Sequence, residues 1–190
     1  MTREDDIDTI LLTAEEKMEK AVAVTRDDFG GVRTGRASPA FVEKLMVDYY
    51  GAATPLQQLG SISVPESRLL VINVYDQNAV GGVEKAIRNS DLGLNPNTEG
   101  NVIRLNFPPL TGERRSELVK MVRGKAEDGR VAIRNLRHTA NKALEALERD
   151  HEISEDDLHR SEKEIQDLTN DHTAQIDALL VNKEQELLED

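Results

Sequence analysis

Four arginines in the second half of the chain have the residue type and spacing to bind anions. Arg123, Arg130, Arg134 and Arg137 follow one another at intervals of seven, four and three residues. On a helix that turns 100° per residue, these positions lie within about 40–60° of one another. Guanidinium groups in such a line can each bind a phosphate through two parallel hydrogen bonds. The spacing therefore predicts a basic, solvent-facing stripe, with the phosphates of a nucleic acid as one candidate ligand.

The distribution of charge bears on whether this stripe is functional. The whole chain carries a net charge of −12, which by itself argues against a nucleic-acid partner. Residues 110–149, however, hold 10 basic and 6 acidic side chains, whereas residues 150–190 hold 3 and 14. A charged run is most often a solvated face paired with acids of neighbouring helices. On the residues alone, both interpretations stay open.

Residues suited to catalysis or metal binding do not form a recognisable constellation. The chain contains no Cys, which excludes thiol nucleophiles, disulfides and Cys-based zinc sites. No phosphate-binding glycine loop, dinucleotide fingerprint or nucleophile elbow is present. The four histidines lack metal-ligand spacing, and His172 falls near an apolar helix face, where a hydrogen-bonded core histidine is expected. We therefore predict a binding protein, not an enzyme, without a metal or cofactor.

The arginine stripe needs a long helix to present it, and residues 111–149 predict one. Apolar or small residues recur there at alternating steps of three and four, as in a coiled coil or an antiparallel bundle. Such a helix would be roughly 55–60 Å long. The predicted seam consists of Val119, Val122, Ala126, Gly129, Ile133, Leu136, Ala140, Ala143 and Leu147.

Two further helices are expected to pack against the first. Ser154, with Asp157 three residues on, predicts the start of a helix that buries Leu158, Ile165, Leu168, Ile176, Leu179 and Leu187. The short link before it makes the two helices antiparallel neighbours. Residues 4–33 predict an amphipathic helix. A three-helix bundle formed by residues 1–34 and 110–190 is the simplest arrangement.

Residues 35–109 change to strand periodicity and predict an inserted α+β domain. Strands are expected around Val47, Ile62, Leu69–Tyr75 and Ile103, with a helix over residues 78–90. Glycine and proline punctuate both crossings between the predicted domains, at residues 33–39 and 108–112, which indicates a hinge. The N-terminus lacks an apolar signal core and no run approaches the ~20 residues of a membrane span, so we expect a cytoplasmic protein.

Nine short strings, in this order and spacing, are similar to those of bacterial ribosome recycling factors. Each string is weak alone, but all nine are collinear in a chain of this length, which makes the resemblance specific, and the resemblance covers the chain from about Ile7 to Leu188. The strings are Arg33-Thr-Gly-Arg-Ala-Ser-Pro39, Tyr49-Tyr-Gly51, Thr54-Pro-Leu56, Val83-Glu-Lys-Ala-Ile87, Ser90-Asp-Leu-Gly-Leu-Asn-Pro96, Pro108-Pro-Leu-Thr111, Glu113-Arg-Arg115, Val122-Arg-Gly124 and Ile153-Ser-Glu-Asp-Asp157.

The resemblance implies a fold and a function. It implies an L-shaped, monomeric α+β protein in which a long three-helix bundle carries an inserted β/α/β sandwich. It also implies that the helical arm binds large-subunit ribosomal RNA after termination. Elongation factor G, which uses GTP, then drives separation of the subunits, and the factor itself hydrolyses nothing.

The resemblance also assigns residues. Arg134 and Arg137 match arginines that contact ribosomal RNA, and Arg115 and Arg130 are expected to join them, together with Arg123 of the same stripe. Four other residues match the hinge region: Arg33, Gly35, Arg36 and Pro109. Two departures are His138, where some members have another arginine, and Gly30-Gly31. The alternative from another class is a helical adaptor or chaperone-like protein whose stripe binds an acidic protein.

Overall fold

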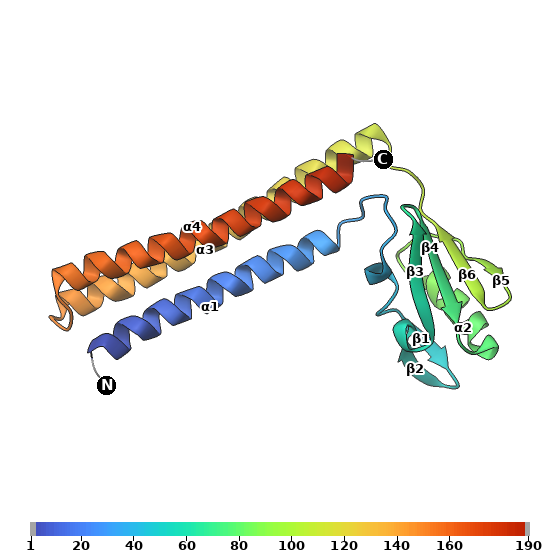
Figure 1. Ribbon diagram of the computed structural model, residues 1–190, viewed down its shortest axis with the longest axis horizontal. Coiled ribbons are helices and arrows are strands. Elements are labelled where there is room, and N and C mark those ends of the chain that lie inside the picture. Colours follow the sequence, from blue (N-terminus) through green and yellow to red (C-terminus); the bar gives the residue numbers. More distant parts are fainter. Residues whose placement is uncertain (1–2, 189–190) are drawn as a thin grey trace. The chain divides into compact units, whose positions relative to one another are not determined.

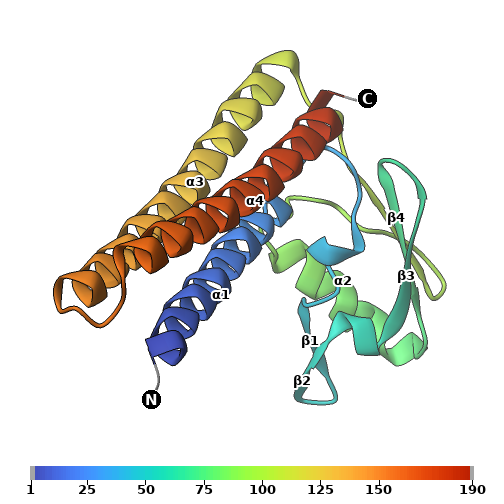
Figure 2. The same cartoon turned by 60° about the vertical axis from the view of Figure 1, so that its left-hand side comes forward.

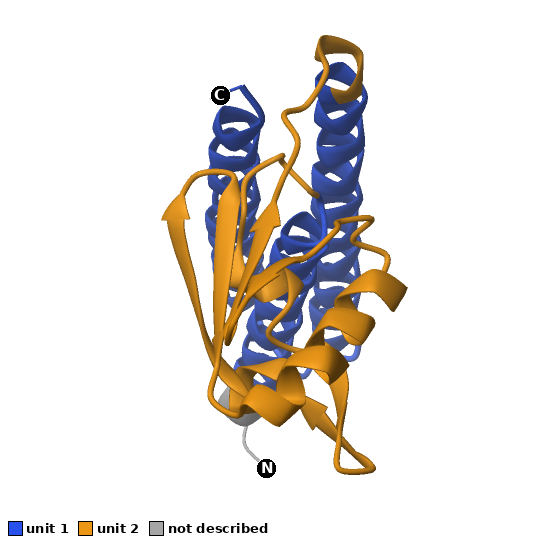
Figure 3. Ribbon diagram, turned by 90° about the vertical axis from the view of Figure 1, so that its right-hand side faces the viewer, with its two compact units in different colours: residues 1–32, 115–189 blue, residues 33–114, 190 orange. Residues whose placement is uncertain are grey.

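The computed structural model describes residues 3–188, and the chain divides into two compact units. The first unit takes in the chain up to Val32 and again from Arg115 onward, and the second runs from Arg33 to Arg114 (Figure 3). The second unit is thus an insertion between two parts of the first. Each unit has its own core, so each is described separately.

Three long helices make up most of the first unit: α1 (Arg3–Gly30), α3 (Gly112–Arg149) and α4 (Glu155–Leu188). They lie alongside one another, with α3 and α4 antiparallel (Figures 1 and 2). Helix α1 ends at Gly30, three residues before the predicted end, because the Gly30-Gly31 pair has low helix propensity. Helix α4 begins where predicted: the Ser154 hydroxyl accepts a hydrogen bond from the Asp157 amide at 3.1 Å.

Small residues let the three helices approach closely. A Cβ built on Gly129 of α3 would lie 2.9 Å from Ile176 Cδ1 of α4 and would collide with Thr25 Oγ1 of α1. Nearer the link between α3 and α4, Ala14, Ala140, Leu144 and Ile165 form a second shared cluster. All three helices therefore contribute to one core, and the predicted packing of long helices is confirmed.

The predicted seam of α3 is confirmed in its middle and shifts at its ends. Val122, Ala126, Gly129 and Ile133 are buried as expected. Toward the ends, the buried positions are Leu118 and Leu144, whereas the predicted Val119, Ala143 and Leu147 are half-buried. An α-helix has 3.6 residues per turn, so its buried face drifts against a strict 3.5-residue repeat over several turns.

Helix α4 buries more polar groups than its sequence pattern predicted. Ile165, Ile176 and Leu187 are buried as predicted, but Leu158, Leu168 and Leu179 are half-buried. Ser161, Thr169 and His172 are buried in their place. Each satisfies its polar atom within the helix, for example His172 Nδ1 against the Leu168 carbonyl oxygen at 2.7 Å. The expectation of a hydrogen-bonded core histidine is thereby confirmed.

The second unit is built on a four-stranded antiparallel sheet in the order β3-β4-β6-β5, beside a two-stranded hairpin. The hairpin is β1 (Met46–Tyr49) with β2 (Ala52–Pro55). The sheet strands are β3 (Gly60–Glu66), β4 (Leu69–Val74), β5 (Asn97–Glu99) and β6 (Val102–Asn106), and the one long helix of the unit is α2 (Val80–Asn89). The predicted α+β class, with a small sheet unit beside long helices, is confirmed.

The core of the second unit lies between α2 and the strands. Alternate residues of β4 and β6, such as Ile72 and Ile103, are fully buried with Val83 and Ile87 of α2. A Cβ on Gly82 would lie 2.8 Å from the Asp48 carbonyl oxygen, so α2 also packs directly on β1. Strand β4 buries Leu70, Ile72 and Val74, whereas β3 buries only Gly60, so β4 is the more buried of these two strands.

Strands β2 and β5 were not predicted, because both are short and neither alternates apolar with polar residues. Their positions depend on turns: Tyr50 and Gly51 have φ of 51° and 81°, as in the tight turns that connect antiparallel strands. Gly100, with φ of 61°, lies in the turn between β5 and β6. These two turns therefore place β2 beside β1 and β5 beside β6.

Candidate anion-binding surface

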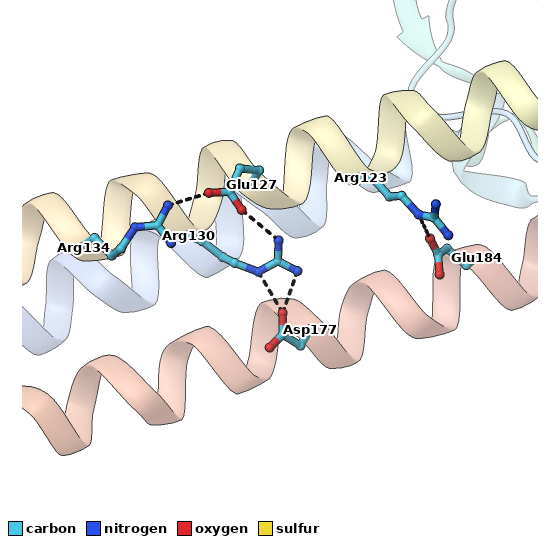
Figure 4. Close-up of polar contacts among 6 residues, drawn as sticks. All are labelled: Arg123, Glu127, Arg130, Arg134, Asp177 and Glu184. Atoms are coloured by element: carbon cyan, nitrogen blue, oxygen red, sulfur yellow. Dashed lines mark hydrogen bonds and ion pairs between the residues drawn. The ribbon is translucent and has the colours of Figure 1, made fainter.

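The predicted arginine stripe lies along the part of α3 that packs beside α4. Figure 4 shows Arg123, Arg130 and Arg134 on one side of α3, with Asp177 and Glu184 reaching toward them from α4. Helix α3 holds the arginines at the predicted spacing because residues 112–149 form one uninterrupted helix. The surface thus combines a row of cations on one helix with acids from its neighbour.

Two arginines form ion pairs across the helix interface. Arg123 Nε donates to Glu184 Oε1, and Arg130 donates to Asp177 Oδ1 from Nε at 2.8 Å and from Nη2 at 2.7 Å. The second pair lies seven residues further along α3 and seven residues back along α4. The antiparallel register of the two helices therefore repeats the same pairing after one heptad.

Glu127, on α3 itself, links Arg130 to Arg134. Its Oε2 accepts from Arg130 Nη1 at 3.1 Å, and its Oε1 accepts from Arg134 Nη2 at 2.5 Å (Figure 4). These hydrogen bonds hold the pKa of Glu127 below its usual value, with Arg134 the larger cause and Arg130 the second. The hydrogen bond to Asp177 is the largest cause that raises the pKa of Arg130; burial opposes it as the next largest effect, and the hydrogen bond to Glu127 raises the pKa further. Glu127 and Arg130 are therefore both charged at neutral pH.

Exposure along the stripe is uneven, which corrects the expectation that all of it faces solvent. The side chains of Arg123 and Arg134 are 63% and 48% exposed, but that of Arg130 is only 22% exposed. Arg137 is half-buried and donates to Gln166 Oε1 of α4 at 2.9 Å. The interpretation of paired acids from a neighbouring helix therefore describes Arg123 and Arg130, while Arg123 and Arg134 remain accessible to an external ligand.

Arg115 lies four residues into α3 and is half-buried. It belongs to the helical unit, whereas Arg114 belongs to the second unit. The five arginines are thus placed on one helix.

The predicted hinge residues lie next to the boundaries between the units. Arg33 donates to the carbonyl oxygens of Asp91 and Leu92, so its side chain is fixed to the second unit. Gly35 has φ of 79°, and a Cβ there would lie 3.1 Å from Leu110 Cγ, which joins the two crossing segments. Arg36 is half-buried and Pro109 is exposed.

The acids around the stripe were missed from the sequence. Glu127 could have been found, since it stands three residues before Arg130, a spacing that brings side chains together on a helix. Asp177 and Glu184 carry no such local signal, because their positions opposite α3 depend on the register of two helices.

Within residues 3–188, no group of three or more His, Cys, Asp or Glu side chains is arranged to hold a metal ion. In the same range, no helix is long and apolar enough to cross a membrane.

Comparison with known proteins adds independent evidence. The family model described as ribosome recycling factor matches residues 25–188. Ribosome-recycling factors of Renibacterium salmoninarum and Acidothermus cellulolyticus are 55% and 54% identical over 183 residues, which is 96% of this chain and 99% of theirs.

Two solved structures are similar in fold. A solution structure of the ribosome recycling factor is 46% identical, with a TM-score of 0.81 over 96% of this chain and 97% of that one. A model of the T. thermophilus factor, with E. coli elongation factor G bound to the E. coli post-termination complex, is 45% identical. It has a TM-score of 0.68 and covers the whole of both chains.

The fold and the surface define a class of protein: an α+β protein in which a bundle of long helices carries an arginine row and a small inserted α+β unit. Within that class, the chain belongs to the ribosome recycling factor family. The resemblance drawn from the nine sequence strings is confirmed.

Proposed function

We propose that this protein binds the ribosome after termination and, with elongation factor G and GTP, splits it into subunits and releases it from mRNA. Residues 1–34 and 110–190 act as the arm that binds large-subunit ribosomal RNA, and residues 35–109 form the domain that moves. The protein works as a monomer in the cytoplasm and needs no cofactor of its own, since GTP is used by elongation factor G.

The observation that carries this proposal is the accessible part of the arginine row on α3. Arg134 is half-exposed and Arg123 more so, and both are held by carboxylates that exposed phosphates can replace. Phosphate contacts of this kind position a protein on RNA without reading its sequence. Arg115, Arg130 and Arg137 extend the same surface. The acidic face of α4 repels RNA and therefore orients the bundle with α3 toward it.

The hinge is proposed at Arg33, Gly35, Arg36 and Pro109. Both boundaries between the compact units fall close to these residues, at Val32/Arg33 and Arg114/Arg115. Because Arg33 is bound to the second unit, it would move with that unit.

Splitting of post-termination ribosomes tests the function directly. We expect subunits to separate when this protein, elongation factor G and GTP are all present, and not when any one is omitted. Light scattering follows the reaction. Absence of splitting with the complete set, by protein shown to be folded, would contradict the proposal and favour the adaptor alternative.

Replacement of two arginines tests the surface. Arg134→Ala with Arg137→Ala should weaken ribosome binding strongly, at up to ~1.5–3 kcal/mol for each lost charge-assisted hydrogen bond. The matched control is Arg26→Ala with Arg160→Ala, which removes the same charge from exposed positions on α1 and α4. Binding by the wild type should also weaken as salt rises. The logarithm of the association constant should fall with the logarithm of the salt concentration, with a slope of about 0.7–0.9 for each phosphate contacted. Equal binding by both double variants would exclude this surface.

A further inference from the structure

Glu127 occupies the position between two arginines that a phosphate group would take. One carboxylate oxygen bonds Arg130 and the other bonds Arg134, so the two guanidinium groups share a single bridging anion (Figure 4). Two non-bridging oxygens of an RNA phosphate offer the same pair of acceptors. The carboxylate thus has the charge and the bidentate form of the proposed ligand.

We propose that Glu127 is an internal competitor, which an RNA phosphate displaces from Arg134 when the factor binds the ribosome and which thereby limits its affinity. This inference rests on the proposed function and assigns a regulatory role to a residue within the same surface. Its consequence is that the factor binds less tightly than its arginines allow, which favours release after the subunits have separated.

Arg130 does not need Glu127 to hold its position. Glu127 therefore competes with a phosphate for the arginines and is not required to orient them. Asp177 holds the Arg130 guanidinium through two nitrogen atoms, at 2.8 and 2.7 Å, independently of Glu127. Arg130 therefore keeps its place when Glu127 moves away. Helix α3 fixes the backbone of Arg134 in any case, so Glu127 is not needed to bring the two arginines to one face.

Because the Glu127–Arg134 ion pair is exposed, its replacement by a phosphate–Arg134 pair costs little free energy. The side chains of Glu127 and Arg134 are 52% and 48% exposed, so their ion pair lies in contact with water. Pairs of this kind contribute little net stability, because solvent screens them. A phosphate that replaces Glu127 forms an equivalent bond to Arg134, while the released carboxylate stays near the RNA and repels it.

Protonation does not remove the competitor near neutral pH. Hydrogen bonds from Arg134 and then Arg130 lower the pKa of Glu127, so it is charged under the conditions in which ribosomes bind. Substitution is therefore the way to remove its charge.

Glu127→Gln tests the inference, with Asp128→Asn as the matched control. Both changes remove one negative charge from the same turn of α3, but Asp128 is exposed and points 100° further round the helix. Binding to purified ribosomes, measured by pelleting, should become about threefold to tenfold tighter for Glu127→Gln. Asp128→Asn should change it less than twofold, roughly as expected for a screened distant charge. Glu127→Ala should act in the same direction as Glu127→Gln.

A second background separates competition for Arg134 from a general charge effect. If Glu127 acts by occupying Arg134, the gain from Glu127→Gln should largely disappear in a chain that also carries Arg134→Ala. A gain of unchanged size in that background would overturn the inference, as would binding by Glu127→Gln no tighter than that of Asp128→Asn.

The two proposals fail differently. Wild-type binding by the Arg134→Ala, Arg137→Ala variant means that the ribosome does not use this surface. Loss of binding by that variant, without a gain in Glu127→Gln, overturns the role of Glu127 alone. Far-UV circular dichroism of each variant establishes that the helices are intact.

Discussion

The two units of this protein achieve a stable core by different means. The α+β unit buries large aliphatic side chains such as Ile72, Ile87 and Ile103, all fully inaccessible to solvent. The helical unit also buries large side chains, such as Ile133 and Ile176, but where its helices approach most closely it has Gly129 and the Thr25 hydroxyl. It also joins α3 to α4 through ion pairs at the surface.

This difference has a physical cause. A small sheet covered by one helix must bury as much apolar area as it can, because it has few residues with which to offset the entropy of folding. Long helices can bury apolar area along their whole length. How closely they pack depends on the distance between their axes, which small residues at the contact shorten. Loss of volume should therefore be harmful at the centre of the sheet, and gain of volume at the close contact around Gly129.

The strongest test of this comparison removes volume from the sheet. Ile72→Ala leaves a cavity at the centre of β4, where the residue is fully buried, and should lower the free energy of unfolding by about 2–5 kcal/mol. The chain has no Trp, and its three Tyr, at positions 49, 50 and 75, all lie in this unit. Tyrosine fluorescence during urea unfolding therefore reports the effect. An unchanged midpoint would contradict the account of this core.

Addition of one methyl group to the helical unit should have the next largest effect. Gly129→Ala places a Cβ against Thr25 and Ile176, at a cost of about 1–3 kcal/mol from overpacking. Helix propensity alone predicts the opposite sign, a gain of about 1 kcal/mol.

Gly124→Ala is the control for that change, on the same helix. A Cβ at Gly124 meets nothing within 4 Å, so only the gain in helix propensity should appear. Thermal unfolding followed by far-UV circular dichroism measures both variants. Stabilisation by both would mean that close approach at Gly129 is not a constraint.

Two glycines on either side of a unit boundary should differ in how much an alanine changes the free energy of unfolding, by a smaller amount than above. Gly35, in the α+β unit, has φ of 79°, so Gly35→Ala should cost about 1–2 kcal/mol. Gly30 ends α1 in the helical unit with nothing within 4 Å of a Cβ, so Gly30→Ala should be neutral or stabilising by up to about 1 kcal/mol. Urea unfolding of both variants tests the pair, and a loss of similar size at both positions would contradict it.

The smallest expected effect is a pH dependence that both units share. In the α+β unit, the Asn78 amide and the Tyr49 hydroxyl hold the pKa of Asp76 below its usual value. In the helical unit, the Ser154 hydroxyl does the same for the pKa of Asp157. A lowered folded pKa stabilises the protein above the unfolded pKa of 3.8, and that stability is lost as pH falls through the folded value.

Asp76→Asn and Asp157→Asn should therefore each unfold slightly more readily than the wild type at neutral pH. In both cases, the difference should shrink as the solution is acidified below about pH 4. Tyrosine fluorescence follows the first variant and circular dichroism the second. A difference that persists in acid would show that the charge of the carboxylate is not its cause.

Sequence by itself determined the elements with strong periodicity and the features that depend on neighbouring residues. The length of α3, the spacing of its arginines and the cap of α4 at Ser154 all follow from local geometry. The family was also evident, because nine strings in order are specific even where each is weak. The buried face of α3 was predictable in its middle, where any helical repeat agrees, but not at Leu118 and Leu144.

Tertiary structure alone decided features that depend on two elements at once. Strand β2 exists because it pairs with β1 across the Tyr50–Gly51 turn, although its own residues show no strand pattern. Asp177 and Glu184 meet Arg130 and Arg123 because the antiparallel register of α3 and α4 brings them together. Side chains 47 or 61 residues apart in the chain leave no periodic trace of their contact. The arginine stripe was thus predictable from the sequence, but the carboxylates of Asp177 and Glu184 that pair with it were not.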